Sequence, residues 1–450
     1  MPGHKGRGPL GCEELDITEI AGADELYEAE GIIAQSEANA TQLFGTARTY
    51  YSTEGSSQCI RAMLHLALQM RPTKAGRPVL LAARNAHKAL LYAAALLDFD
   101  IQWLWPAPDA AGTLCTCPVE PEALSSALDE LAAEGRTPFG VYLTSPDYLG
   151  FVQDIAGLSA VCHTHGLPLL VDNAHGAYLH FLKEGSRHPI RLGADLCCDS
   201  AHKTLPVLTG GAYLHLGPSV QADEAAVRNA LALFGSTSPS YLILQSLDAA
   251  NAVLADSFRE KLDVCRWRLG MLCRELDALR PGLALPLTGA HREPLKLTLD
   301  AATLGLSGQQ LAQALRARGV ECEYADPRYV VLMPSAESSA AEFACLQTAL
   351  HAICGEAPAA DVSVTADDSA AFAALAGALE AQPRRFTIRE AVLAPQEMIP
   401  AAEAVGRICA VPAVSCPPAI PIVVSGETVP PEALPLFARY GIEKAAVVKE

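Results

Sequence analysis

Short apolar runs alternate with longer amphipathic stretches from about residue 40 to residue 216. The runs have the length and residue types of buried strands, and stretches such as 121–134 and 158–165 have a helical pattern. The expected strands are 79–83, 141–145, 167–174, 195–199 and 212–216. Strands that alternate with helices predict an α/β fold with a mostly parallel sheet and helices on both faces. In such a sheet a functional site lies beyond the carboxyl ends of the strands.

The pattern changes after residue 216. Residues 217–285 are expected to be mainly helical, and residues 290–356 to form a small α+β unit with strands near 295–299 and 329–333 and helices at 307–318 and 340–354. An Ala-, Asp- and Pro-rich stretch at 355–368 predicts a linker. Beyond it lie the segment 387–393, a helix-like segment at 401–409 and a Pro-rich turn at 416–421. We therefore expect a major domain of residues 1–285, a small α+β domain of residues 286–356 and a C-terminal α+β domain of residues 369–450.

The composition is that of a globular protein. Half of the 450 residues are hydrophobic and 19% are charged, and the net charge of −18 makes nucleic acid an unsuitable partner while it is compatible with a cationic substrate. The longest apolar stretch, at 89–97, is too short to span a membrane, and no targeting segment is visible, so we expect a cytoplasmic protein. None of the fourteen cysteines stands in a C-x-x-C pair, which favours reduced buried thiols over a metal site or disulfides.

The first chemistry-bearing segment is Ser200-Ala201-His202-Lys203. Its lysine follows the expected strand at 195–199, and a lysine amine that is partly removed from water can form an imine with an aldehyde. Ser200 and His202 flank the lysine and could donate hydrogen bonds to a phosphate. An ordinary surface lysine in a loop is the alternative that this short motif leaves open.

The second segment is Asp172-Asn173-Ala174-His175-Gly176, which ends the apolar run at 169–171. A carboxylate at the end of a buried strand needs a cationic partner, and a protonated pyridine nitrogen would serve, because the ion pair makes the ring an electron sink. The alternative is that Asp172 only caps a helix.

Two further segments lie earlier in the chain. Gly55, Ser56 and Ser57 open an expected helix, whose free N–H groups and dipole would suit a phosphate. His87 follows the expected strand at 79–83 and could stack on a flat aromatic cofactor, although a lone histidine is more often structural. The order of the four segments is a phosphate loop, a stacking histidine, an aspartate and a lysine, with Asp172 and Lys203 one strand–helix–strand unit apart. This order is far more specific than any single motif.

With these segments the chain resembles the ornithine/lysine/arginine decarboxylase family, whose core has the pyridoxal-phosphate (PLP)-dependent transferase fold of type I. The resemblance covers nearly the whole chain. It is carried by M-P-G-H-K-G at 1–6, L-D-I-T-E-I at 15–20, N-A-H-K at 85–88, L-T-S-P at 143–146, D-N-A-H-G at 172–176, S-A-H-K-T-L-P-V-L-T-G-G at 200–211, S-T-S-P-S-Y at 236–241, and the runs 404–409 and 417–426.

The resemblance implies roles for individual residues. Lys203 would carry the Schiff base with PLP, Asp172 would pair with the pyridine nitrogen and His87 would stack on the ring; these three form the expected catalytic set. Further cofactor-binding residues would be Gly55, Ser56, Ser57, Ser145, Ala174, His175, Ser200 and His202. In a homodimer with shared sites, Ser236, Thr237 and Ser238 would reach the partner's phosphate. No metal is expected, and assembly beyond the dimer is left open.

The chain departs from the family pattern at several positions. Asn173 stands where the family commonly has Glu, and Glu54 brings a negative charge next to the expected phosphate loop. Ala419 replaces the glycine of the Pro-rich turn, which a negative φ would allow. The short helix that usually precedes M-P-G-H-K is missing from this sequence.

The expected activity is PLP-dependent decarboxylation of arginine, lysine or ornithine to the amine, a reaction of polyamine biosynthesis. Glu427, just after the Pro-rich turn, is the candidate group for the distal cation of the substrate, with a solvated surface carboxylate as the alternative. Two other readings remain open. One is another reaction on the same core, as in an aminotransferase, lyase or aldolase, and the other is a regulatory or scaffolding paralogue without catalysis.

Overall fold

The computed structural model describes residues 1–72, 76–107, 113–357, 369–382, 385–411, 413–414 and 420–450. The strands of its main sheet are β1 (Arg48–Ser52), β2 (Val79–Ala83), β3 (Asp100–Leu104), β4 (Val141–Thr144), β5 (Leu169–Asp172), β6 (Leu196–Asp199) and β7 (Ala212–Leu216). Their order across the sheet is β1-β7-β6-β5-β4-β2-β3. β4, β5 and β6 run parallel, whereas β7 is antiparallel to both β6 and β1. The carboxyl ends of β5 and β6 therefore open on the same edge of the sheet, as a functional site requires.

The chain forms two compact units, each made of three separate stretches. Unit 1 consists of Met1–Leu81, Pro121–Ser145 and Ile155–Leu262, and unit 2 consists of Ala82–Glu120, Pro146–Asp154 and Asp263–Glu450. Because these units are discontinuous, they do not test the domain boundaries expected from the sequence, which stay a prediction.

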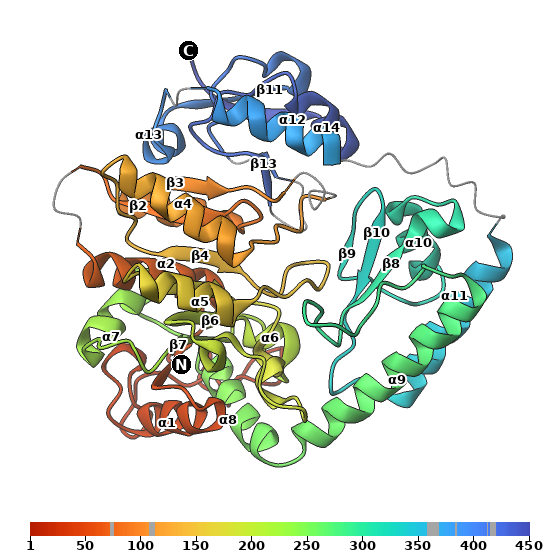
Figure 1. Cartoon of the computed structure of the whole chain (residues 1–450). Helices are drawn as coiled ribbons and strands as arrows, with labels where there is room; N and C mark the ends of the chain where they lie inside the picture. Colours follow the sequence, from red (N-terminus) through yellow and green to blue (C-terminus); the bar gives the residue numbers. More distant parts are fainter. Residues whose placement is uncertain (73–75, 108–112, 358–368, 383–384, 412, 415–419) are drawn as a thin grey trace. The chain divides into compact units, whose positions relative to one another are not determined.

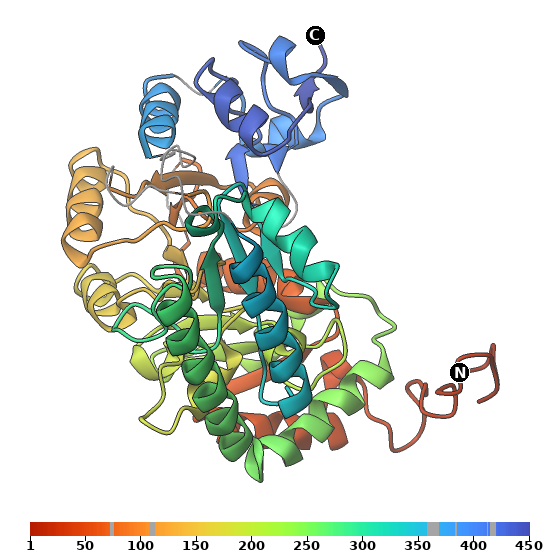
Figure 2. The same ribbon diagram turned by 90° about the vertical axis from the view of Figure 1, so that its right-hand side faces the viewer.

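Helices surround the strands of unit 1. They are α1 (Ile32–Phe44), α2 (Gly55–Met70), α4 (Pro121–Ala133), α5 (Ile155–Thr164), α6 (Ala201–Thr204), α7 (Glu224–Ala232) and α8 (Tyr241–Ala255). α2 lies against β1, β5, β6 and β7, because Ile60, Met63, Leu64 and Ala67 form one buried apolar stripe at helical spacing. α1 and α8 lie side by side (Figure 1), and Tyr241 and Gln245 of α8 donate hydrogen bonds to the carbonyls of Asp24 and Leu15 in the segment before α1, whose first residues lie at the edge of the view in Figure 2.

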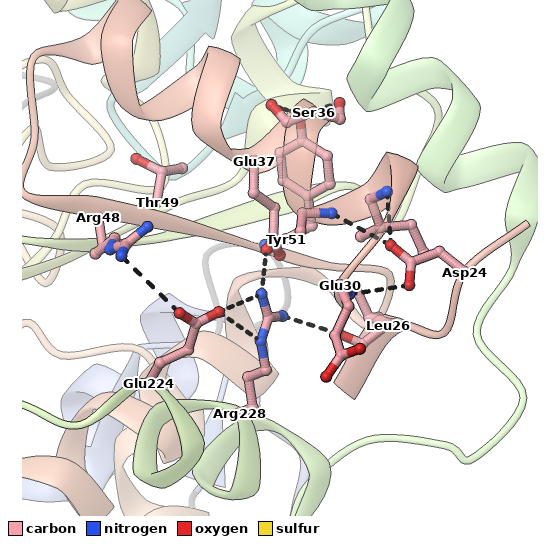
Figure 3. A network of polar contacts seen from close by, with 12 residues as sticks. Asp24, Leu26, Glu30, Ser36, Glu37, Arg48, Thr49, Tyr51, Glu224 and Arg228 are labelled. Carbon is pink, nitrogen blue, oxygen red and sulfur yellow. Dashed lines mark hydrogen bonds and ion pairs between the residues drawn. The ribbon is translucent and has the colours of Figure 1, made fainter. Parts of the chain in front are cut away.

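A buried polar network ties α1, β1 and α7 together (Figure 3). The guanidinium of Arg228 donates to Glu37 at 2.9 Å, to Glu224 at 2.9 and 3.1 Å, and to the Leu26 carbonyl at 3.0 Å. The other carboxylate oxygen of Glu37 accepts the Tyr51 backbone N–H at 2.9 Å. The ion pair between Glu37 and Arg228 joins α1 to α7, and the hydrogen bond from the Tyr51 N–H joins α1 to β1.

Unit 2 contains a small antiparallel sheet and a C-terminal α+β part. The sheet has the order β8-β10-β9, with β8 (Leu297–Asp300), β9 (Tyr324–Ala325) and β10 (Tyr329–Leu332); β11 (Gln396–Pro400) pairs with β14 (Lys444–Val448), and β12 (Ala413–Val414) pairs with β13 (Pro421–Val423). Its helices are α3 (Lys88–Leu97), most of α9 (Phe258–Leu279), α10 (Gly308–Arg316), α11 (Ala340–Glu356), α12 (Ser369–Glu380), α13 (Ile388–Leu393) and α14 (Ala433–Arg439). α10 packs on β10 and on α11 (Figure 1).

The structure confirms each strand expected between residues 79 and 216, and the small α+β unit. The expected helix at 401–409 is wrong: only Ala401–Glu403 form a 3₁₀ turn, and Gly406 then adopts a φ of +80°, which an α-helix cannot accommodate. The strands β1, β3 and β11 were missed because polar residues interrupt their apolar runs, although most positions of β1 and β3 are at least partly buried. The Pro-rich turn and most of the expected linker lie outside the described residues.

Among the described residues, no helix is both long and apolar enough to cross a membrane. The described cysteines are all free thiols.

Candidate active site

Asp172 ends β5 and is almost completely buried. Its carboxylate accepts the hydroxyl of Tyr142 at 3.1 Å, the backbone N–H of Ala174 at 3.1 Å and the thiol of Cys198 at 3.7 Å. Burial raises the pKa of Tyr142 well above its ordinary value, so the phenol stays protonated and donates. These donors hold the Asp172 carboxylate at the carboxyl end of the strand, where the sequence predicted it.

Lys203 lies in the short helix α6, directly after β6. Its Nζ is 3.0 Å from Nε2 of His175, which is buried on the loop that follows β5. The two side chains meet because β5 and β6 are parallel neighbours whose following loops rise from the same edge of the sheet. An amine in contact with an imidazole is suited to exchanging a proton.

A second group of residues gathers around the start of α2. Ser200 Oγ donates to Ser56 Oγ at 2.7 Å, the Gly55 N–H donates to the Gly210 carbonyl at 2.7 Å, and a His202 ring nitrogen is 2.9 Å from the Gly211 carbonyl. Gly210 has a φ of +103°, and a Cβ there would lie 2.8 Å from the Thr53 carbonyl, so only glycine lets the two loops approach this closely. The N-terminus of α2 and two serine hydroxyls thereby lie together, an arrangement that would suit an anion.

Of the remaining predicted cofactor residues, some lie beside Asp172 and the start of α2, and others lie on an exposed loop. Ser145 is buried and its N–H donates to the Asp172 carbonyl, while Ala174 and Ser57 are half-buried beside the groups just described. The loop at Ser236–Ser238 is exposed, as a contact with a partner subunit would need, but no second chain is present to test it. Glu54 is exposed at the N-cap of α2, and its side chain makes no capping hydrogen bond.

His87 and Glu427 belong to unit 2. His87 is the N-cap of α3, and its Nδ1 accepts the Ala89 N–H at 3.2 Å. Glu427 is buried rather than solvated; it accepts the Val424 N–H at 2.7 Å and lies 3.4 Å from the guanidinium of Arg84. Their relation to Lys203 stays a prediction.

Sequence reasoning missed a buried cluster behind these residues. His188, Asp199 and His215 have fully buried side chains, and Nε2 of each ring lies 3.0–3.1 Å from the same oxygen of Asp199. Asn173, noted in the sequence only as a departure, donates to the other oxygen of Asp199 at 2.6 Å. The only sequence signal was the polar Asp199 in an otherwise apolar strand, because His188 and His215 join it through the fold.

The donors and acceptors of unit 1 fit PLP. Lys203 would hold the aldehyde, Asp172 the pyridine nitrogen, and Ser56, Ser200 and the start of α2 the phosphate. The buried Thr53 hydroxyl, beside Gly210, has no hydrogen-bond partner within the described part of the chain and is a further donor for an anion.

Comparisons with known proteins identify the family and the fold. Residues 12–266 match the family model described as Orn/Lys/Arg decarboxylase, major domain. The chain is 30% identical to the uncharacterized protein YaaO of Bacillus subtilis (strain 168), over 94% of this chain and 85% of the relative. It is 27% identical to an arginine decarboxylase of the same organism, over 96% of this chain and 88% of that protein. The lysine decarboxylase LdcF of Francisella novicida superposes with a TM-score of 0.77 at 17% identity, covering 100% of this chain and 78% of that one, which confirms the predicted fold class.

Proposed function

Because the chain belongs to the Orn/Lys/Arg decarboxylase family, we propose that it removes the α-carboxylate of a basic amino acid with PLP held on Lys203. The observation that carries this proposal is the 3.0 Å contact between the Lys203 amine and His175, three residues after the buried Asp172. An amine, an imidazole and a carboxylate on neighbouring strand ends supply the three kinds of group that such a reaction uses.

When bound, PLP would supply an electron sink for the electron pair left by the departing carboxylate. The residues of the chain contribute binding and proton transfer. Asp172 keeps a proton on the pyridine nitrogen by pairing with it, and the donors from Tyr142 and Ala174 hold the carboxylate in place for that task. Ser56, Ser200 and the start of α2 bind the phosphate end, which fixes the orientation of the ring.

One proton has to replace the carboxylate at Cα of the substrate, since CO₂ leaves without a proton. Lys203 Nζ and His175 Nε2 are the pair that supplies it. His175 takes a proton from the lysine ammonium or returns one to it, so that the amine can act both as nucleophile and as acid. His87 would lie against one face of the ring and Ala174 against the other, as the family resemblance implies.

The substrate class rests on the family and on relatives named for arginine or lysine. Glu427 is the candidate for the distal cation, and Arg84 would have to share or release it on binding. Assays of CO₂ release from arginine, lysine and ornithine test the reaction, with Lys203→Ala as the control. Wild-type protein that binds PLP through Lys203 but releases no CO₂ from any of the three would refute the decarboxylase function, and formation of an oxo acid would identify a transaminase instead.

We further propose a cytoplasmic homodimer in which the Ser236–Ser238 loop completes the partner's phosphate site. The three residues are exposed within one chain, which suits such a contact. Mixing an inactive Lys203→Ala protein with an inactive Thr237→Arg, Ser238→Arg protein tests it. Hybrid dimers with one intact site would regain activity, whereas two self-contained subunits would stay inactive after mixing.

A further inference from the structure

The contact between β5 and β6 continues past their last backbone hydrogen bond through a hydrogen bond between two side chains, which we call the side-chain rung. Asp172 is paired with Cys198 in the parallel register, and the Asn173 N–H donates to the Cys198 carbonyl at 2.9 Å. One residue further on, the Asn173 side-chain amide donates to Asp199 at 2.6 Å. This side-chain contact therefore joins the two loops at the ends of their strands.

The rung lies between the groups that carry the proposed chemistry. Asn173 directly follows Asp172, and Asp199 stands four residues before Lys203. Further along, the two loops also meet where Lys203 contacts His175. A change in the separation of Asn173 and Asp199 would therefore move the lysine relative to both Asp172 and His175.

Asp199 is held so firmly that it can act as a fixed point. Its side chain is fully buried, and one carboxylate oxygen accepts both His188 and His215 while the other accepts Asn173. Burial by itself would raise the pKa of Asp199, but the interactions of its carboxylate with His188 and His215 outweigh burial and hold the pKa well below its usual value. The amide of Asn173 therefore donates to a charged acceptor, which makes a stronger bond than a neutral one. Rotation of the carboxylate would break several bonds at once.

A metal ion is the competing explanation for two histidines and an aspartate whose ligand atoms lie so close together. Nδ1 of His188 has no hydrogen-bond partner within the described residues. If Nε2 bound a metal, Nδ1 would carry the proton, and a buried N–H without an acceptor is costly. If Nε2–H instead donates to Asp199, Nδ1 is a bare acceptor, which is tolerated better. The hydrogen-bonded arrangement is therefore favoured.

We propose that Asn173 and Asp199 are positioning residues that clamp the loop bearing Asp172 to the loop bearing Lys203. This inference rests on the proposed function for its effect on catalysis, but the clamp itself is a property of the chain without any cofactor. It also explains Asn at position 173, since a glutamate there would oppose the Asp199 carboxylate, whereas an amide donates to it.

The test uses three variants of the full chain and one matched control. Asn173→Asp sets two carboxylates against each other, Asp199→Asn removes the charged acceptor, and the double swap N173D/D199N restores an amide–carboxylate pair with reversed direction. Asn251→Asp is the control: Asn251 is also a buried asparagine of unit 1, and its amide donates to Tyr51 at 2.8 Å away from the strand ends. It makes the same chemical change at a site that does not join the two loops.

Two measurements distinguish a role in positioning Lys203 from a role that only stabilises the fold. In the apoprotein, the pH dependence of Lys203 labelling by an amine reagent, followed by mass spectrometry, reports the environment of the amine without PLP. Titration of the apoprotein with PLP then gives the dissociation constant. We expect the midpoint of labelling to shift and PLP affinity to fall by about 10-fold or more in each single variant, because small displacements of reacting groups have large effects. The double swap should regain most of both, and Asn251→Asp should lose unfolding stability but keep both values.

The clamp would be overturned if Asn173→Asp and Asp199→Asn kept the labelling midpoint and the PLP affinity of the wild type while losing as much stability as the control. A stoichiometric metal in the purified wild type that Asp199→Asn abolishes would replace it with a metal site. If the wild type fails to bind PLP, the proposed function is wrong, and the labelling midpoints still decide whether the clamp exists.

Discussion

Glu37 and Asp199 are both buried carboxylates of unit 1, yet their surroundings move their pKa values in opposite directions. Glu37 faces the permanent cation of Arg228, but burial outweighs it and raises the pKa of Glu37 to about 7. Asp199 faces only two histidines and an amide, and its pKa is held well below the ordinary value. A formal positive charge nearby is therefore a poor guide to which carboxylate remains ionised.

The difference lies in how the donors are shared. Arg228 divides its N–H groups among Glu37, Glu224 and a backbone carbonyl, and the charge of Glu224 itself opposes ionisation of Glu37 (Figure 3). Asp199 shares its close donors with no other carboxylate. For Arg228 the interactions with Glu37 and Glu224 outweigh burial and raise its pKa, whereas for Glu37 burial outweighs the same ion pair. The surroundings of a buried carboxylate as a whole, and not the presence of a permanent cation alone, decide whether it stays ionised.

The largest effect should come from removing the cation of the shared network. Arg228→Met leaves Glu37 buried without its partner, and we expect the free energy of unfolding at pH 7 to fall by about 3–5 kcal/mol. Chemical denaturation measures it. The double variant E37Q/R228M should recover a good part of the loss, and a loss below about 1 kcal/mol for Arg228→Met would mean that burial of Glu37 costs little.

The pH dependence of stability distinguishes the two carboxylates directly. Glu37 binds its proton more tightly in the folded state, up to about pH 7, than in the unfolded state. This proton therefore stabilises the folded protein fully below the usual pKa of a glutamate, and the stabilisation is lost as the pH rises through 7. We expect wild type to lose about 3 kcal/mol relative to Glu37→Gln between pH 4 and pH 8. Denaturation of both proteins across that range measures the difference, and a constant difference would contradict the raised pKa.

The dedicated donors of Asp199 should each be worth less than the cation of Arg228. His215→Phe keeps a ring but removes one donor to Asp199 and the contact with Thr49, and we expect a loss of about 2 kcal/mol at pH 7. Because the folded pKa of Asp199 is lowered, the stability it contributes is present at neutral pH and is lost in acid as the pH falls below the ordinary value. Acid unfolding of His215→Phe should therefore begin at a higher pH than that of wild type, and unchanged acid unfolding would count against the role of these donors.

The smallest effect on the free energy of unfolding is expected at Glu224, the partly exposed member of the hydrogen-bond network around Arg228. The Glu224 side chain is 45% exposed, so its contact with Arg228 is screened by water. Glu224→Gln should change the free energy of unfolding by no more than about 0.5 kcal/mol at pH 7. It should also lower the pKa of Glu37, because it removes a like charge. In the Glu224→Gln protein, the loss of stability that accompanies deprotonation of Glu37 should therefore occur at a lower pH. A large loss of stability would show that Glu224 is a core partner of Arg228.

Much of the α/β core and several groups of the site could be predicted from the sequence because local patterns encode them. The run that ends in Asp172 and the loop that holds Lys203 each follow an apolar strand, and adjacency of two parallel strands then brings them together. The segment at 401–409 was misread because apolar spacing alone cannot reveal that Gly406 takes a positive φ. The family resemblance, rather than periodicity, singled out His175.

The cluster around Asp199 could not be predicted in this way. His188, Asp199 and His215 are separated by eleven and sixteen residues, and each taken alone is an unremarkable polar residue. They meet because η3 (Pro189–Leu192), β6 and β7 are neighbours in the fold. The same holds for Glu37 and Arg228, whose pairing depends on contacts between the first helix and a helix far along the chain.

The interleaving of the two units has a consequence for synthesis on the ribosome. Unit 1 contains all of its residues once Leu262 has left the exit tunnel, but the stretch that carries His87 belongs to a unit whose largest part begins at Asp263. At roughly 5–20 residues per second, about 15–65 s pass between the synthesis of Glu120 and that of Glu450, so residues 82–120 wait that long for the partners made last. During that time the helix α3 lacks its neighbour α13, so the nascent chain exposes a segment that chaperones can bind.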